Sequence, residues 1–362
     1  MASFEKRPNG KWRGIVSALD AKGKQKKISK TCDTLREAKK WAFDLESKKS
    51  AGYDIQKGKQ LFPEYFENWV LTFKAPNIRT STMMSYTGWI RVVNELFEGL
   101  PLNKLTLQIV QSGIVKYAET RSKSTTRGFV IAIRSALENA HHDGSIERDI
   151  YSRLQVVGQK SKKAEQVNYF NETEFYKLKA KLYELEPEYR RKPIYLALLI
   201  ALETGARIGE VLALTPGSIH LTDGIIDIKK SYSRKTKEIT DPKTESSVRS
   251  INISEHLCDA IARHINGLHE DEHFFLPIGF FAHCDALDKL KEELDLKRDV
   301  TVHGLRHTHV SVLYANGIDI AYISKRLGHS NIAMTLKIYT HLLQEKENNL
   351  TKETLSILSR DF

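Results

Sequence analysis

The sequence predicts an α+β fold that is mainly α-helical and divided into three domains. Apolar residues recur at spacings of three and four along most of the chain, and polar caps or glycines bound these runs, as in amphipathic helices. Short β-rich runs occur in two regions, residues 8–33 and 224–254. With 362 residues, 41% of them hydrophobic, the chain can form about two or three domains with cores of their own.

The first predicted domain, residues 1–57, combines a small β-sheet with one helix. The turn PNG, the strand KWRGIVSALD, the turn AKGK and the strand KQKKISKTCD precede the helix. This helix opens with the capping-box pattern TLRE, from Thr34 to Glu37. Residues 47–60 are predicted to form a linker to the next domain.

Positive charge is concentrated in this first domain. The chain has 56 Lys and Arg against 45 Asp and Glu, a net charge of +11 and a pI near 9.3, which indicates a polyanionic partner. Residues 1–50 alone hold 14 basic and 6 acidic residues. Such a run is often only a solvated surface, but a whole module with most of the excess favours nucleic acid. We expect its sheet to contact DNA through Trp12, Arg13, Lys26 and Lys27.

The second predicted domain, residues 58–160, is a bundle of four or five helices. Helical periodicity covers residues 61–73, 80–97, 106–119 and 125–144. Polar residues on these helices are candidates for phosphate contacts, although solvated surface is an equally good interpretation of any one of them. The candidates are Ser81, Lys123, Arg127 and Arg134.

The third predicted domain, residues 161–362, consists of helices around one small antiparallel sheet. Residues 158–166 form a basic, polar hinge, and Asn171 with Glu174 caps the first helix. Further helices are predicted over residues 177–185, 195–214 and 303–317, and strands over residues 224–230 and 247–254.

Cysteine usage and hydropathy limit where the protein acts. Cys32, Cys258 and Cys284 lie far apart without CxxC spacing, so neither a disulfide framework nor a cysteine zinc site is indicated. The longest apolar run, residues 194–202, is too short to span a bilayer, and the N-terminus lacks a signal-peptide pattern. We therefore expect a cytoplasmic protein without a membrane partner.

Four clusters and one tyrosine in the third domain could carry chemistry. Each has an ordinary structural explanation: a helical Arg-Glu surface pair for Arg207, an exposed side chain for Lys243, a helix cap for His329, and a core position for Tyr339. Tyr339 shares the helical stripe of Ile332, Leu336 and Leu343. His303 and Arg306 lie three residues apart at a helix start, on one face.

A zinc site is the alternative for the histidines. His303 and His307 have the four-residue spacing of helical metal ligands, and five of the 13 histidines fall in this region, at positions 303, 307, 309, 329 and 341. The glutamate of an HExxH motif is absent, and an arginine beside the histidines would repel a cation. No cofactor is therefore expected.

Taken together, these residues describe a cationic pocket with one nucleophile, which suits a phosphodiester substrate. Two arginines can hold both non-bridging oxygens, and a protonated lysine can supply a proton to a departing alkoxide. A phenol with a pKa near 10 needs a proton acceptor or a strongly positive environment before it attacks phosphorus.

The order ARIGE, PKTESSVRS, HGLRHTH, LGHS and IYTH resembles the signature of the tyrosine recombinases, the phage-integrase family, over about residues 168–345. The resemblance implies that Arg207, Arg306 and His329 stabilise the transition state and that Tyr339 is the nucleophile of a 3′-phosphotyrosyl bond. It also implies Lys243 as general acid to the 5′-hydroxyl and His303 as acid/base, without metal or ATP.

The upstream regions fit the same family. Residues 58–160 resemble its core-site-binding domain, and residues 1–57 resemble the arm-binding domain of integrases from phages and integrative elements. The resemblance implies double-stranded DNA as partner, at core and arm sites, and a homotetramer on DNA. Residues 349–362, with Leu355, Leu358 and Phe362 in helical spacing, would dock on a neighbouring protomer or pack on their own domain.

Two rival functions and several properties stay open at this point. A type IB topoisomerase shares the chemistry but exchanges no strands, and a DNA-binding regulator would have lost the active site. The sequence leaves open the attachment sites, the direction of recombination, and whether an excisionase or a DNA-bending host protein takes part.

Overall fold

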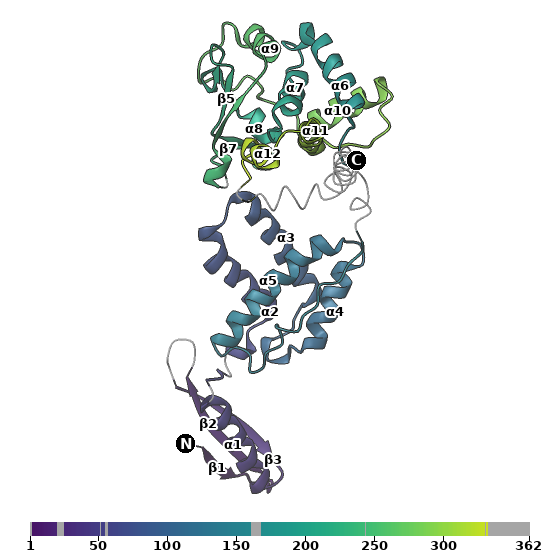
Figure 1. The fold of residues 1–362 in the computed structure, drawn as a ribbon. Coiled ribbons are helices and arrows are strands. Elements are labelled where there is room, and N and C mark those ends of the chain that lie inside the picture. The colour runs from purple at the N-terminus through teal and green to yellow at the C-terminus, as the bar shows by residue number, and fades with distance from the viewer. Residues whose placement is uncertain are drawn as a thin grey trace, which may run out of the picture. The chain divides into compact units, whose positions relative to one another are not determined.

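The computed structural model (Figure 1) describes residues 2–19, 25–50, 52–54, 57–160, 168–242, 244–329 and 331. The chain divides into two compact units, Met1–Glu165 and Gln166–Phe362. Both contain mainly helices with small antiparallel sheets, which confirms the predicted fold class. No helix among the described residues is long and apolar enough to cross a membrane.

The first unit begins with a three-stranded antiparallel sheet covered by one helix. Its strands, in the order β1-β2-β3, are Ser3–Lys6, Trp12–Leu19 and Gln25–Cys32, and helix α1 is Leu35–Ser50. The hydroxyl of Thr34 accepts a bond of 3.2 Å from the amide of Glu37, as predicted. The Glu37 carboxylate returns to the amide of Asp33, one residue earlier than in a capping box.

Two predictions for this region need correction. Strand β1 was not predicted, because its four residues SFEK carry no clear alternation. Helix α1 continues to Ser50, so the linker predicted to begin at residue 47 starts later. The last turn of α1 holds Lys48 and Lys49, which favour a helix C-terminus.

The helical bundle follows in the same unit and agrees with the four predicted helices. Thr106 and Ser122 cap the last two helices, their hydroxyls each accepting a bond of 3.2 Å from the backbone amide three residues on. Residues such as Phe62, Phe66 and Phe129 are fully buried between the helices. The helices are α2 Phe62–Trp69, continued by a π-helical turn Val70–Lys74, α3 Thr80–Leu96, α4 Leu107–Ala118 and α5 Lys123–His142.

The second unit packs helices around the apolar helix α7, Ile194–Thr204. Leu196, Leu198, Leu199 and Leu202 of α7 have no exposed surface, because α6, α10 and α11 pack around it. Asn171 and Glu174 form the predicted capping box of α6. The other helices are α6 Glu172–Glu184, α8 Ile208–Leu212, α9 Glu255–Ile265, α10 Ala282–Glu293, α11 Val302–Ala315 and α12 Ile320–Leu327.

The described residues of this unit form two small antiparallel sheets, one more than the sequence predicted. The predicted strands β5 Ile225–Ile228 and β8 Arg249–Asn252 pair with each other, and β4 Ile219–His220 extends this sheet on the β5 side. The additional hairpin pairs β6 Ser231–Ser233 with β7 Glu238–Thr240. Strands of three residues give too little alternation to be recognised in sequence. Short 3₁₀ turns occur at Lys57–Lys59, Ala75–Asn77, Leu102–Lys104, Glu186–Glu188, Pro216–Ser218 and Glu245–Ser247.

The helix predicted over residues 195–214 is broken at Gly205. This residue has a φ of +67° and ends α7 in the left-handed conformation that glycine adopts without strain. Arg207 then has extended backbone angles and is the N-cap of α8. Arg207 was predicted within a helix, and the glycine places it at a helix start instead.

Replacing Gly205 with alanine should destabilise the second unit by more than the free-energy cost of placing alanine at a positive φ. A Cβ at Gly205 would lie 2.8 Å from both His309 Cδ2 and Leu327 Cδ2, whereas Gly317, with a φ of +86°, has nothing within 4 Å. We expect Gly317→Ala to lower the free energy of unfolding by about 1–2 kcal/mol. Gly205→Ala should lower it by about 1–3 kcal/mol more because of overpacking.

The measurement is urea unfolding followed by far-UV circular dichroism. All four tryptophans lie in the first unit, at positions 12, 41, 69 and 89, so tryptophan fluorescence provides an internal control that should not shift. Equal losses in the two variants would contradict the close approach at Gly205.

Candidate active site

Arg306 of helix α11 links two chain segments that carry other predicted site residues. Its side chain is buried, with the whole residue only 3% exposed. Nη1 donates to the carbonyl of Gly205 and Nη2 to the carbonyl of Leu327, each over 2.8 Å. These carbonyls lie two residues before Arg207 and two residues before His329. Arg306 therefore brings three elements to one place.

The end of helix α12 is held so that His329 follows it directly. Gly328 caps the helix in the left-handed conformation, with a φ of +70°. The last four carbonyls of a helix lack partners within it, and here all four are paired. Ser324 accepts from the His329 amide, Lys325 from the Gly328 amide, Arg326 from Arg249 Nε, and Leu327 from Arg306 Nη2.

Glu210 fixes the orientation of Arg207. One carboxylate oxygen accepts from Arg207 Nη1 over 2.8 Å, and the other accepts from the Arg207 amide over 2.9 Å and from Arg249 Nη2 over 2.8 Å. The Glu210 side chain is only 6% exposed, so the pair is not the surface salt bridge that the sequence suggested. Burial opposes its charge, but Arg249 and Arg207 outweigh burial and hold the pKa of this carboxyl below its usual value.

The histidines of the site are neutral at pH 7 in the DNA-free protein. Burial, together with the positive Arg306, Arg207 and Arg249, lowers the pKa of His329 to about 4. His303 keeps an exposed edge, yet loss of water around its ring and the charges of Arg306 and Arg207 also lower its pKa. Burial and the neighbouring His303 lower the pKa of His307 to about 4. Among the described residues, the positive charge of the site thus resides in the arginines.

Metal binding finds no support in the described part of the chain. No group of three or more His, Cys, Asp or Glu side chains there could hold a metal ion. The rings of His303 and His307 lie 5.1 Å apart, but Arg306 lies close enough to lower the pKa of both. A second cation would meet the same repulsion.

Lys243 and Tyr339, the predicted general acid and nucleophile, lie outside the described residues. Their roles stay predictions, as does the placement of residues 349–362. The chain resumes after Lys243 at Thr244, whose hydroxyl lies 2.9 Å from the Ser247 hydroxyl in the turn that leads into β8.

The sheet of the first unit presents two of its four candidate residues on the face away from α1. The buried Val16 and Cys32 face α1, and Trp12, which alternates with Gly14 and Val16, lies on that same covered face. Arg13 and Lys27 lie on the opposite face, where Arg13 Nη2 donates to Ser29 over 2.8 Å. The backbone of Lys26 pairs with Ala18, and its side chain is not described.

The candidates in the helical bundle divide in a similar way. Lys123 and Arg127 are exposed one turn apart at the start of α5, and Ser81 is half-buried in the first turn of α3. Arg134 instead donates through Nε and Nη2 to the carbonyls of Tyr151 and Leu154, at 3.3 and 2.6 Å. It thus holds the segment after α5, and its guanidinium is engaged there instead of serving the predicted phosphate contact. The sequence alone could not distinguish these two uses of an arginine.

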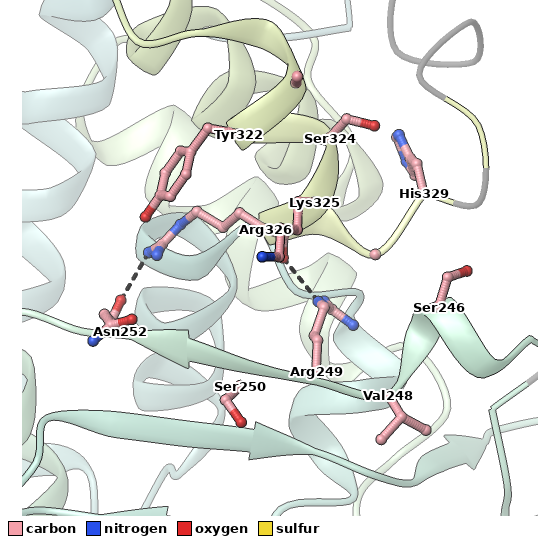
Figure 2. Close-up of a pocket in the computed structure, with 12 residues that line it drawn as sticks. Ser246, Val248, Arg249, Ser250, Asn252, Tyr322, Ser324, Lys325, Arg326 and His329 are labelled. Carbon is pink, nitrogen blue, oxygen red and sulfur yellow. Dashed lines mark hydrogen bonds between the residues drawn. The ribbon is translucent and has the colours of Figure 1, made fainter.

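A groove of about 750 Å³ adjoins the site between strand β8 and helix α12 (Figure 2). Arg249, Lys325 and His329 contribute its polar lining. Val248 and Tyr322, 50% and 52% exposed, contribute apolar surface. The cations that line this groove are Arg249, Lys325 and Arg326.

Residues 172–346 match the sequence profile of the phage integrase family, and this range contains all six predicted catalytic residues. Residues 172–346 therefore form a domain of this family, the tyrosine recombinases. The chain is 25% identical to the prophage ps2 probable integrase of Lactococcus lactis over 96% of this chain and 97% of that protein.

Other relatives match the recombinase over different lengths. A XerC-like tyrosine recombinase of Caldanaerobacter subterraneus is 24% identical over 82% of each chain. Transposase A from transposon Tn554 of Staphylococcus aureus is 31% identical over 43% of this chain and 46% of its own.

Two solved structures share the fold. A Tn1549 transposon integrase in complex with transposon right end DNA has a TM-score of 0.65 and 19% identity, and covers 81% of this chain and all of its own. A lambda integrase dimer bound to a core site has a TM-score of 0.57 and 16% identity, and covers 92% of this chain and 93% of its own.

Two residues of the site were missed in the sequence. The sequence predicts Glu210 only as the partner in a surface pair, and it predicts no role for Arg249 of the motif PKTESSVRS. The signal available for Glu210 was its position three residues after Arg207, which is the N3 position once Gly205 is recognised as a helix end.

The neutral state of the histidines predicts an unusual titration. In the DNA-free protein, NMR signals of the His307 and His329 rings should titrate near pH 4 and those of His309 near pH 3, whereas free histidine titrates near 6.5. Because the unfolded chain binds these protons first, the stability contributed by the neutral rings is fully present above about pH 6.5 and falls as the pH drops towards 4. A His329 signal that titrates near 6.5 would contradict the described environment.

Proposed function

We propose that the recombinase is the integrase of a mobile element, which cleaves and rejoins DNA strands through a 3′-phosphotyrosyl bond. The observation that carries the proposal is the pair of bonds from buried Arg306 to the carbonyls of Gly205 and Leu327. They bring Arg207, Arg306 and His329 together. Two cations beside a neutral histidine suit the binding of a negatively charged phosphodiester.

The two arginines have different tasks in this proposal. Arg306, fixed by its two carbonyl partners, supplies a permanent positive charge in surroundings with little water, where charge acts strongly. The side chain of Arg207 is 38% exposed and held from behind by Glu210, so its guanidinium can bind a non-bridging oxygen. Together they stabilise the negative charge that develops on the phosphate.

Each strand cleavage exchanges one phosphate ester for another. The phenolic oxygen of Tyr339 forms a bond to phosphorus while the bond from phosphorus to the 5′-oxygen breaks. Neutral His303 or His329 can accept the phenolic proton, and Lys243 donates a proton to the departing 5′-oxygen. A new 5′-hydroxyl then attacks the phosphotyrosine in reverse. Because the ester is conserved, the cycle needs neither ATP nor a metal ion.

The wider assembly is proposed from the relatives. We assign residues 1–57 to arm-site binding, residues 58–160 to core-site binding and residues 161–362 to catalysis. The likeness to a lambda integrase tetramer bound to a Holliday junction, with a TM-score of 0.55, supports a homotetramer on DNA. The match to a prophage integrase along 96% of the chain supports an integrase over a topoisomerase or a regulator.

A nicked DNA duplex that carries the crossover site of the element should trap the covalent intermediate. Loss of the short fragment beyond the nick prevents religation, so wild type should accumulate a protein-DNA adduct on denaturing gels, also in the presence of a chelator. Tyr339→Phe should reduce the adduct by at least about a thousandfold, because it removes the nucleophile. Tyr176→Phe, at an exposed tyrosine of α6, is the matched control and should react like wild type.

An adduct in the Tyr339→Phe variant would reject the nucleophile, and dependence on metal would restore the zinc alternative. Relaxation of supercoiled DNA without strand exchange between two crossover sites would favour the topoisomerase.

The face of the N-terminal sheet that points away from α1 should account for part of the affinity for arm-site DNA. Arg13→Ala together with Lys27→Ala removes both cations. The plot of log association constant against log salt concentration should then become less steep by about two, one for each phosphate contact. The control removes two cations from exposed positions of α1, with Lys39→Ala and Lys40→Ala. An equal loss in the control would indicate nonspecific electrostatics in place of a contact face.

A further inference from the structure

Arg249, the first residue of strand β8, makes contacts that its position in the sequence does not explain. Its side chain is only 7% exposed, yet three of its nitrogens each donate to a different segment of the second unit. Nη2 donates to the Glu210 carboxylate over 2.8 Å, Nε to the carbonyl of Arg326 over 2.9 Å, and Nη1 to the carbonyl of Ser247 over 3.0 Å. Each of these segments adjoins a predicted catalytic residue.

The bond to Glu210 links Arg249 to Arg207. The same carboxylate holds the amide and the guanidinium of Arg207, so one buried anion bridges two cations. Without Arg249, Glu210 would keep Arg207 as its ionic partner among the described residues, but the carboxylate that orients Arg207 would lose one of the bonds that fix its own position.

The bond to Arg326 links Arg249 to His329. The carbonyl of Arg326 is one of the terminal carbonyls of α12, and Arg249 is its partner. The next carbonyl, that of Leu327, accepts from Arg306. Figure 2 shows the Arg249 side chain reaching from β8 to the end of α12, with His329 just beyond. A Cβ at Gly328 would lie 3.0 Å from Arg249 Cδ, so glycine permits this close approach.

The bond to Ser247 holds the turn that enters β8. This turn, Glu245–Ser247, also lies against Gly328, where a Cβ would meet the carbonyl oxygen of Ser246 at 2.6 Å. One guanidinium therefore joins the start of α8, the end of α12 and the turn that begins two residues after Lys243.

Stability alone is a weak explanation for such an arrangement. Well-packed apolar residues often replace a buried ion pair without loss of stability, because removing both charges from water is costly. The fork of an arginine, however, fixes the direction and separation of the groups that it joins. A lysine keeps the charge but cannot reach three acceptors in this geometry.

We propose that Arg249 is a positioning residue for recombination, which sets Arg207 and His329 at their working separation without contacting DNA. The proposal rests on the proposed function of the site. It applies to the cleavage step and to its reversal, since both use the same phosphate-binding groups.

The first experiment measures single-turnover adduct formation, DNA affinity and thermal midpoint for Arg249→Lys and Arg249→Met. Arg249→Lys should cleave about 10–100 times more slowly than wild type, because displacements of about 1 Å at a catalytic group cost up to about a hundredfold. DNA affinity should change less than about threefold, since the side chain is buried. Arg263→Lys, at an arginine that is 62% exposed and pairs with Glu186, is the matched control and should match wild type.

The second experiment separates positioning from general destabilisation with a double-mutant cycle. Arg249→Lys is combined with Arg207→Lys, which already lacks the fork that Arg249 helps to orient. If Arg249 acts through Arg207, its substitution should cost much less in this background than in wild type, about threefold or less against 10–100-fold. If Arg249 acted only through general stability, Arg249→Lys would slow cleavage by the same factor of about 10–100 in the Arg207→Lys background as in wild type.

The outcomes are distinct. Failure of wild type to form any adduct would reject the proposed function, whatever Arg249 does. An active wild type together with an equally active Arg249→Lys, or full multiplication in the cycle, would overturn the positioning role. If Arg249→Met does not fold, Arg249→Lys still decides the question.

Discussion

The architecture of the site depends on one buried guanidinium, that of Arg306, and on its need for acceptors. A cation removed from water must be paired or hydrogen-bonded, and Arg306 uses the carbonyls of Gly205 and Leu327. Both carbonyls belong to helix ends, where the backbone lacks partners of its own. The same two bonds thus give the arginine its acceptors and give the two helix C-termini donors for their free carbonyls. Through these bonds, packing of the second unit determines where Arg207 and His329 lie.

The surrounding charges follow from the same arrangement. Arg207, Arg249 and Arg306 lie close enough to lower the pKa of His329, and Glu210 is the carboxylate that bridges two of them. This anion reduces repulsion between the arginines while leaving Arg207 partly exposed. The neutral imidazoles leave a site that is positive before DNA arrives and can still accept a proton. Such a distribution favours a phosphodiester over a metal ion as its ligand.

The sequence predicted correctly those features that depend on residues close to one another in the chain. Helical periodicity and caps located the bundle helices, because their side chains pack within a few turns of one another. The short strands β1 and β6 were missed, since their residues SFEK and SYS carry no clear alternation of apolar and polar side chains. Arg134 was assigned to DNA as a residue on the polar face of a predicted helix, and Trp12 as part of a basic sheet. The fold uses the first to bind two loop carbonyls and places the second on the helix-covered face of its sheet.

The sequence by itself determined the fold class, the family and the types of group that the site contains, because these reside in local patterns and in motif order. Only the tertiary structure decided which groups meet. Arg306 is 101 residues from Gly205 and 21 from Leu327, and Arg249 is 39 from Glu210. Contacts over such separations depend on how helices and strands pack, and no local propensity encodes them. For the same reason, Arg249 is an ordinary arginine of a β-rich motif in the sequence and a junction of three segments in the fold.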